Sequence, residues 1–126
     1  MIEAKLTTGA IPHPLPITCG EEGAVTEFRG LVRPFENGQR IAGLRYEAYE
    51  EMAEREMKRI LGELQGIHPF TRAEVWHRVG FVPAGEAAVS VAIAAKHRGE
   101  AFAAQSAFMD RLKQDVPIWK TEAVPC

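Results

Sequence analysis

Cationic side chains that could bind anionic groups stand at four places along the sequence. In chain order they are Arg33, the pair His97 and Arg98, Lys113, and Lys120. An arginine offers paired hydrogen-bond donors to a phosphate or a carboxylate, whereas a lysine offers a point charge. His97 and Arg98 also stand just before a predicted helix, whose free backbone N–H groups favour anions. If these places meet in the fold, they would form a pocket for a phosphate or a carboxylate.

Lys113 and Lys120 suggest a second kind of chemistry. They are seven residues apart, a spacing that would put them on one face of an unbroken helix, but Pro117 lies between them and breaks such a helix. Two ammonium groups and a guanidinium close together repel one another. This repulsion favours the uncharged amine of one lysine, which could then act as a nucleophile or carry a proton. The alternative is that both are ordinary surface lysines, which are more common.

Other catalytic and cofactor motifs are missing from the sequence. There is no glycine-rich nucleotide loop, no HExxH, no GxSxG and no cluster with the spacing of metal ligands. Cys19 and Cys126 lack CxxC spacing, so we expect neither a disulfide scaffold nor a zinc site. We therefore predict no metal and no cofactor, and a reducing, cytoplasmic setting.

The composition is that of one soluble globular domain spanning residues 1–126, with a proline-rich N-terminal segment over 1–22. Of the 126 residues, 46% are hydrophobic and 25% are charged. The formal net charge of −2 argues against a protein that works mainly on nucleic acid or on an anionic membrane. No apolar stretch is long enough for a transmembrane helix, and the first residues do not resemble a signal peptide.

The hydrophobic pattern predicts the elements that must position the cations. Apolar alternation predicts strands at 2–7, 23–33, 40–49, 72–79 and 86–94, followed by a short extended segment at 118–120. The Asn37–Gly38 turn signal predicts that the strands at 23–33 and 40–49 pair as a hairpin with a long tip. Pro12 to Pro16 should form a rigid extended segment that exposes His13. Trp76 and His77 fall mid-strand, where a half-buried, hydrogen-bonded role is more common than catalysis.

Two helices are predicted, over 50–65 and about 99–113. The first has an apolar stripe and a C-terminal stop at Gly66; the second ends before Pro117, because Val116 disfavours the helical region. The stripe residues of the first helix are Ala53, Met57, Ile60, Leu61 and Leu64. In the second helix, the residues that fall on or near one face are Phe102, Gln105, Phe108, Met109 and Leu112. The order of elements predicts an α+β domain with a mainly antiparallel sheet.

Several segments, in this order and spacing, are similar to the large, catalytic subunit of molybdopterin synthase, the MoaE family. The similarity covers about residues 20–122 and is strongest in the C-terminal part. The matching segments are Gly23-Ala24-Val25, Phe28-Arg29-Gly30-Leu31-Val32-Arg33, Leu44-Arg45-Tyr46-Glu47-Ala48-Tyr49, His77-Arg78-Val79-Gly80, Pro83-Ala84-Gly85-Glu86, His97-Arg98, Ala101-Phe102, Met109-Asp110-Arg111-Leu112-Lys113 and Pro117-Ile118-Trp119-Lys120-Thr121-Glu122.

The resemblance implies a sulfurtransferase of molybdenum-cofactor biosynthesis with the family's α/β-hammerhead type of fold. Such an enzyme converts cyclic pyranopterin monophosphate into molybdopterin by installing the two dithiolene sulfurs. The sulfur donor is the thiocarboxylated C-terminal Gly-Gly tail of a small ubiquitin-like subunit. The large subunits form a homodimer, and one small subunit docks at each end to complete a heterotetramer.

The resemblance also assigns expected roles to individual residues. Lys120 and Lys113 match the two catalytic lysines. Arg33, His97 and Arg98 match substrate-binding positions, and His97 and Arg98 would serve the pocket of the neighbouring subunit. The same binding stretches include Leu31, Val32, Thr121 and Glu122, while Phe28 and Met109 are expected to line the pocket.

Two departures from the family pattern and two alternative functions accompany this interpretation. Leu31 stands where a lysine is common, and the sequence stops at Cys126, where many relatives have a longer tail that covers the site.

The first alternative function is that of a non-catalytic module on the same fold that binds an anion or a partner. The other is an unrelated phosphoryl or acyl transferase that uses Lys113 or Lys120. Phosphoryl transfer normally needs a metal site or a phosphate loop, and the sequence has neither motif.

Overall fold

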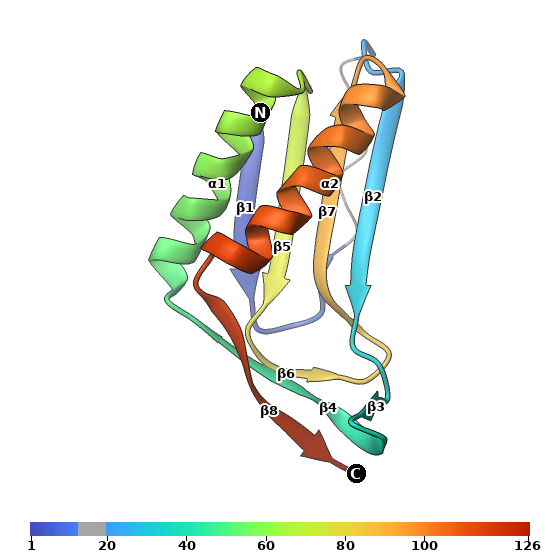
Figure 1. The fold of residues 1–126 in the computed structure, drawn as a ribbon, viewed down its shortest axis with the longest axis vertical. Coiled ribbons are helices and arrows are strands. Elements are labelled where there is room, and N and C mark those ends of the chain that lie inside the picture. The colour runs from blue at the N-terminus through green and yellow to red at the C-terminus, as the bar shows by residue number, and fades with distance from the viewer. Residues whose placement is uncertain (13–19) are drawn as a thin grey trace.

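Two helices lie side by side on one face of a four-stranded sheet, and a smaller sheet lies across one end of that sheet (Figure 1). The computed structural model describes residues 1–12 and 20–126. The predictions for His13, for the prolines that follow it and for Cys19 lie outside the described residues. The α+β class predicted from the sequence is confirmed. None of the helices in the described part of the chain is both long and apolar enough to cross a membrane.

The larger sheet has the strand order β1-β5-β7-β2. Its strands are β1 (Ile2–Thr7), β5 (Arg72–Arg78), β7 (Ala87–Ala95) and β2 (Ala24–Leu31). β1 pairs with β5 in parallel, whereas the β5–β7 and β7–β2 pairs are antiparallel. The predicted mainly antiparallel sheet is therefore correct for this layer.

The smaller sheet is centred on β4 (Gln39–Ala48). β4 pairs with β3 (Phe35–Glu36), with β6 (Gly80–Pro83) and with β8 (Ile118–Pro125), all antiparallel. β6 was not predicted from the sequence, and β8 runs well beyond the short extended segment that was expected. β8 is therefore a full strand of the second sheet.

The predicted hairpin between 23–33 and 40–49 is wrong. β2 pairs along its whole length with β7, with a register irregularity between Gly30 and Leu31, and the Val32 N–H still donates to the Glu86 carbonyl before the chain bends at Pro34. The Asn37–Gly38 turn is present, with positive φ at both residues, as a tight hairpin turn requires. It joins β4 to the two-residue β3 instead, so the two long strands belong to different sheets.

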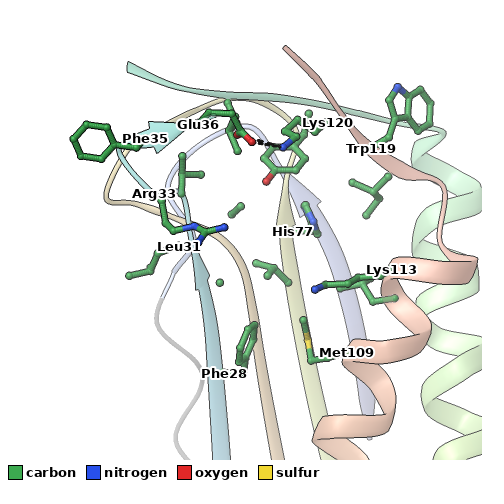
Figure 2. Close-up of a pocket in the computed structure, with 18 residues that line it drawn as sticks. Phe28, Leu31, Arg33, Phe35, Glu36, His77, Met109, Lys113, Trp119 and Lys120 are labelled. Atoms are coloured by element: carbon green, nitrogen blue, oxygen red, sulfur yellow. Dashed lines mark hydrogen bonds and ion pairs between the residues drawn. The ribbon is translucent and has the colours of Figure 1, made fainter. Parts of the chain in front are cut away.

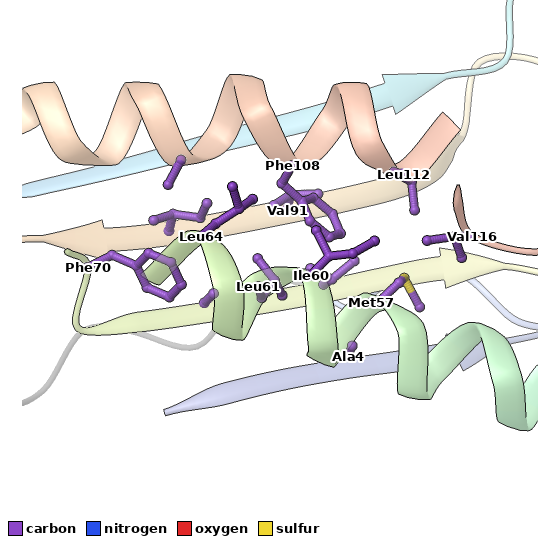
Figure 3. Close-up of a cluster of buried hydrophobic side chains, with 14 of the residues drawn as sticks. Ala4, Met57, Ile60, Leu61, Leu64, Phe70, Val91, Phe108, Leu112 and Val116 are labelled. Atoms are coloured by element: carbon purple, nitrogen blue, oxygen red, sulfur yellow. The ribbon is translucent and has the colours of Figure 1, made fainter. Parts of the chain in front are cut away.

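The main hydrophobic core lies between the two helices and the larger sheet (Figure 3). Helix α1 (Glu50–Ile67) buries all five residues of its predicted stripe. It passes through the predicted stop at Gly66 by one residue. Val91 and Ile93 of β7 and Phe108 of α2 are completely buried against it. A second, smaller cluster lies beneath the second sheet and contains Val32, Ile41, Leu44, Val82 and Ala88.

Helix α2 (Arg98–Asp115) is held on the sheet by a polar contact as well as by apolar packing. The Thr26 hydroxyl donates to Gln105 Oε1 at 2.8 Å, and Gln105 Nε2 donates to the Val91 carbonyl at 3.3 Å. Buried amides usually have such partners because an unpaired one is costly. Of the five residues predicted to fall on or near one face of this helix, Gln105, Phe108 and Leu112 are buried, whereas Phe102 is 61% exposed. The small residues Ala101 and Ala104 occupy the face of α2 that meets the sheet.

The end of α2 matches the prediction made from Pro117. Val116 has φ −92° and ψ 130°, the extended conformation expected before a proline. The chain then enters β8 directly, so Lys113 lies in the last turn of the helix and Lys120 lies on the strand. The short Pro117 connection thereby brings lysines from a helix and from a strand to one region.

Candidate functional site

A cavity of about 520 Å³ lies where the two sheets meet the C-terminal end of α2. β2, β5 and β7 of the larger sheet, β3, β4 and β8 of the smaller one, and α2 all contribute lining residues. Its size is suited to a small-molecule ligand. Since several elements far apart in sequence form it, the fold itself must set its shape.

Three cations predicted from the sequence line this cavity. Arg33 follows β2, Lys113 comes from the last turn of α2, and Lys120 comes from β8. Figure 2 shows the side chains of Arg33 and Lys113 pointing into the same space as His77. Of the described residues that line it, one is a carboxylate, Glu36. The cavity is therefore positively charged within a chain whose formal net charge is −2, and this arrangement suits an anionic ligand.

Lys120 has a direct counter-charge within the cavity. Its Nζ lies 3.2 Å from Glu36 Oε1 and 3.3 Å from Glu36 Oε2, so it donates to both carboxylate oxygens (Figure 2). The two side chains are partly exposed, at 46% for Lys120 and 30% for Glu36. The sequence predicted only repulsion among the cations, and Glu36 was not among the predicted site residues. An anion that binds Lys120 has to compete with this carboxylate.

A β-bulge in β8 decides which of its side chains reach the cavity. Tyr46 of β4 is opposite Lys120, and the next residue of β4, Arg45, is opposite Glu122, so Thr121 is an extra residue between the two pairs. A bulge of this kind changes the face on which the following side chains lie. Lys120 and Tyr46 both line the cavity, whereas Glu122 forms an ion pair with Arg45 at 3.1 Å.

Thr121 and Glu122 therefore do not line the cavity, although the family resemblance placed them in binding stretches. Thr121 Oγ1 donates to the Arg45 carbonyl at 3.4 Å. The other predicted lining residues do surround the cavity: Phe28, Leu31, Val32 and Met109. Leu31 is 60% exposed and leaves an apolar side chain at the rim.

His97 and Arg98 are not at this cavity within one chain. They stand at the N-terminal end of α2, whereas Lys113 stands at its C-terminal end. Fifteen residues of helix between Arg98 and Lys113 correspond to about 22 Å. Their predicted role in a pocket therefore requires a second copy of the chain.

Two titratable residues of the cavity were not predicted as site residues. His77 is buried, and its Nδ1 lies 2.8 Å from the Arg78 carbonyl oxygen. Burial lowers the pKa of His77, and that hydrogen bond acts in the opposite direction. Burial and then the negative charge of Glu36 raise the pKa of Tyr46, whose ring contacts the His77 ring edge-to-face at 5.4 Å.

The signals for these two residues were present in the sequence but not specific. His77-Arg78-Val79-Gly80 and Tyr46 belong to segments that carry the family resemblance. A mid-strand histidine is nevertheless more often structural than functional, so the pattern alone gave no reason to select His77. Within the described residues, no group of three or more His, Cys, Asp or Glu side chains is placed to hold a metal ion.

Comparison with known proteins identifies the family. Residues 6–115 match the profile described as "MoaE protein". This chain belongs to the MoaE family. A rice relative named "Molybdopterin synthase catalytic subunit" is 47% identical over 100 residues, which cover 79% of this chain and 52% of that protein. A relative from Pyrococcus abyssi with the same name is 41% identical over 106 residues, covering 84% of this chain and 72% of that protein.

Solved structures of MoaE relatives have the same fold. The crystal structure of molybdopterin synthase from Staphylococcus aureus superposes with a TM-score of 0.84 at 31% sequence identity, covering 92% of this chain and 87% of that one. The MoaE protein from Burkholderia ambifaria gives a TM-score of 0.81 at 29% identity, covering 99% and 85%. This chain spans about half the length of the rice relative.

Proposed function

We propose that this chain is the catalytic subunit of a molybdopterin synthase, a sulfurtransferase of molybdenum-cofactor biosynthesis. It would transfer sulfur from the thiocarboxylated Gly-Gly tail of a small ubiquitin-like subunit to cyclic pyranopterin monophosphate and so form the dithiolene. The observation that carries the proposal is the cavity in which Arg33, Lys113 and Lys120 come together. Membership in the MoaE family and the names of the relatives support it.

The charges of the cavity fit the charges of these reactants. A phosphorylated pterin and a thiocarboxylate are both anionic. Arg33 has the paired donors that suit a phosphate, and the two lysines can stabilise negative charge that develops on oxygen or sulfur during transfer. Phe28 and Met109 supply apolar lining against which a flat ring can pack. We assign the catalytic roles to Lys120 and Lys113 and substrate binding to Arg33.

We further propose that the chain works as a homodimer within a heterotetramer, in the cytoplasm. In this assembly His97 and Arg98 of one chain complete the cavity of its neighbour. The position of both residues at the opposite end of α2 from Lys113 motivates this part of the proposal. Thr121 and Glu122, which lie off the cavity, would then act through the position of β8 instead of by contact with the substrate.

The test is a reconstituted assay. The purified chain is mixed with cyclic pyranopterin monophosphate and a thiocarboxylated small subunit, and molybdopterin is measured as its fluorescent oxidation product. Lys120→Ala should lower the rate about 100-fold or more, since it removes a group expected to act in the transition state. Lys58→Ala is the matched control, because Lys58 is exposed on α1 and does not line the cavity.

Each outcome decides between the functions considered. Product with the wild-type chain and with Lys58→Ala, but little with Lys120→Ala, supports the proposal. No product from a chain that still binds the small subunit would instead identify a non-catalytic partner-binding module. Neither product nor binding of the small subunit or the pterin would reject the synthase function.

A further inference from the structure

The imidazole of His77 is held in one tautomer. Its Nδ1 lies 2.8 Å from the carbonyl oxygen of Arg78, and a carbonyl oxygen can only accept, so Nδ1 donates. Burial lowers the pKa of His77, so at neutral pH the ring carries one proton, the proton on Nδ1. Nε2 then has a free lone pair. Nε2 has no hydrogen-bond partner among the described residues. It is also not fully enclosed, because it is not among the buried side-chain atoms of these residues that lack a partner. It is therefore the ring nitrogen left for the cavity that His77 lines.

The other polar side chains around this cavity are poor proton acceptors. Arg33, Lys113 and Lys120 are donors without a lone pair while they carry a proton. The raised pKa of Tyr46 keeps its phenol protonated. Glu36 is an acceptor, but both of its oxygens are bonded to Lys120. Among the described side chains that line the cavity, His77 Nε2 is thus the acceptor that is not engaged in an ion pair.

The proposed function requires such an acceptor. When a thiocarboxylate sulfur becomes bonded to a carbon of the substrate, the sulfur still carries the acyl group of the tail. Water must then attack the acyl carbon; a C–O bond forms, the acyl C–S bond breaks, and the sulfur leaves as a thiolate on the substrate. The tail becomes a carboxylate. Two protons are released and no electrons are exchanged.

We propose that His77 is the general base of this hydrolytic step, accepting through Nε2 one proton of the attacking water while the second proton goes to solvent. The inference rests on the proposed function and adds a catalytic residue to it. Bound anions would assist His77. Burial disfavours a positively charged imidazole, whereas a phosphate and a thiocarboxylate bring the negative charge that stabilises it.

The groups that face His77 come from several elements, and each can affect its titration. They are Arg33 after β2, Glu36 on β3, Tyr46 on β4, Lys113 on α2 and Lys120 on β8. On the two strands paired with β5, the residues opposite His77 are Leu6 of β1 and Val89 of β7, neither of which titrates. A pH profile therefore has to be compared between variants that leave these groups unchanged.

His77→Gln tests the base directly. Glutamine preserves polarity but cannot accept a proton at neutral pH. In the reconstituted assay we expect kcat to fall about 100-fold, the usual order for loss of a general base, while KM for the pterin changes less than about threefold. Wild-type kcat should decline on the acidic side as His77 becomes protonated, and this acidic decline should be absent from His77→Gln. His68→Gln, at the C-terminal end of α1 and outside the cavity lining, is the matched control and should retain both the rate and the decline.

A second pair of variants separates a chemical role from a structural one. His77→Ala leaves space beside the cavity, and added imidazole should restore part of its kcat if the missing group is a base. If His77→Gln does not fold, His77→Asn replaces it, because the asparagine amide can still donate to the Arg78 carbonyl. A folded His77→Gln or His77→Asn with wild-type kcat, or with an unchanged acidic decline, overturns the inference. If the wild-type chain forms no molybdopterin, the proposed function is overturned instead. Failure of the inference about His77 and failure of the proposed function therefore give different results.

Discussion

The Lys120 ammonium lies 3.2 Å from the carboxylate of Glu36, although the two residues are 84 positions apart in the sequence. The contact joins β8 to β3 within the lining of the cationic cavity. A candidate catalytic lysine is thus paired with a carboxylate of the same chain before any ligand arrives. The carboxylate occupies the lysine in the way that a carboxylate or thiocarboxylate from a partner would.

Glu36→Gln should strengthen the binding of anionic ligands to the cavity. The variant removes the carboxylate that competes for Lys120. A partly exposed ion pair is worth up to about 1 kcal/mol, so we expect the affinity for cyclic pyranopterin monophosphate to rise about threefold in titration calorimetry. Glu63→Gln removes a carboxylate that pairs with Arg59 and Arg111 outside the cavity lining, and it should leave the affinity unchanged. Weaker binding by Glu36→Gln would mean that Glu36 contacts the ligand itself.

Mixing two inactive variants tests whether Arg98 serves a neighbouring chain. Lys120→Ala and Arg98→Ala are each expected to be inactive. Random pairing makes half of the dimers mixed, and each mixed dimer has one cavity with both residues intact, so about a quarter of wild-type activity should return. The measurement is the molybdopterin assay after the two variants have been unfolded and refolded together. No recovery would place Arg98 and Lys120 in the same chain's site, and an Arg98→Ala variant that is active by itself would show that Arg98 is dispensable.

Phe108→Ala should be strongly destabilising. Phe108 is completely buried between α2, α1 and the sheet, so truncation leaves a cavity and costs about 3–5 kcal/mol of the free energy of unfolding. Phe102→Ala makes the same change on the same helix at a side chain that is 61% exposed, and it should cost less than about 0.5 kcal/mol. Urea denaturation of both variants at one protein concentration measures the difference. Equal losses would contradict the placement of α2.

The buried His77 should make the fold less stable in mild acid. Its pKa in the folded chain is lowered from the ordinary value of 6.5, chiefly by burial. Below pH 6.5 the unfolded chain therefore binds a proton that the folded chain does not, and the free energy of unfolding falls as the pH falls. The contribution is at most about 1.4 kcal/mol per pH unit.

The measurement is urea denaturation at pH 7.5 and pH 5.5 for the wild type, His77→Gln and His68→Gln. The carboxylates contribute to all three proteins and cancel in the comparison. His77→Gln should lose less stability than the wild type between the two pH values, whereas His68→Gln should behave like the wild type. Identical losses in all three proteins would show that His77 is protonated as easily in the folded chain as in the unfolded one.

Local patterns in the sequence predicted most of the elements, and nonlocal contacts explain the errors. The stripe of α1, the end of α2 before Pro117 and the turn at Asn37–Gly38 depend on neighbours in sequence, and all were predicted correctly. The partner of β2 depends on β7, about sixty residues away, and no local pattern contains that information. The wrong hairpin followed from assuming that strands adjacent in sequence pair with each other.

The residues of the candidate site also divide into those that local sequence patterns predict and those that nonlocal contacts bring to the cavity. Arg33, Lys113 and Lys120 were selected because cations at the ends of elements are visible in the sequence. His77 and Glu36 were not selected, because their importance comes from β5 and β3 being placed next to the cavity. The different positions of Lys120 and Glu122 depend on the bulge at Thr121, a backbone irregularity without a distinctive residue type.

The unequal sizes of the two hydrophobic clusters have a consequence for motion. The larger cluster anchors α2, and with it Lys113, to the first sheet. The second sheet covers the small cluster around Val82 and reaches the larger one through Ala48 and Ile118. Regions with few buried apolar contacts open at lower free energy than the main core. Backbone amides of β4 and β8 should therefore exchange with deuterium sooner than those of β5 and β7. Lys120 and Glu36 would move together with the second sheet while Lys113 stays fixed, so the spacing between the two lysines is the adjustable dimension of the cavity.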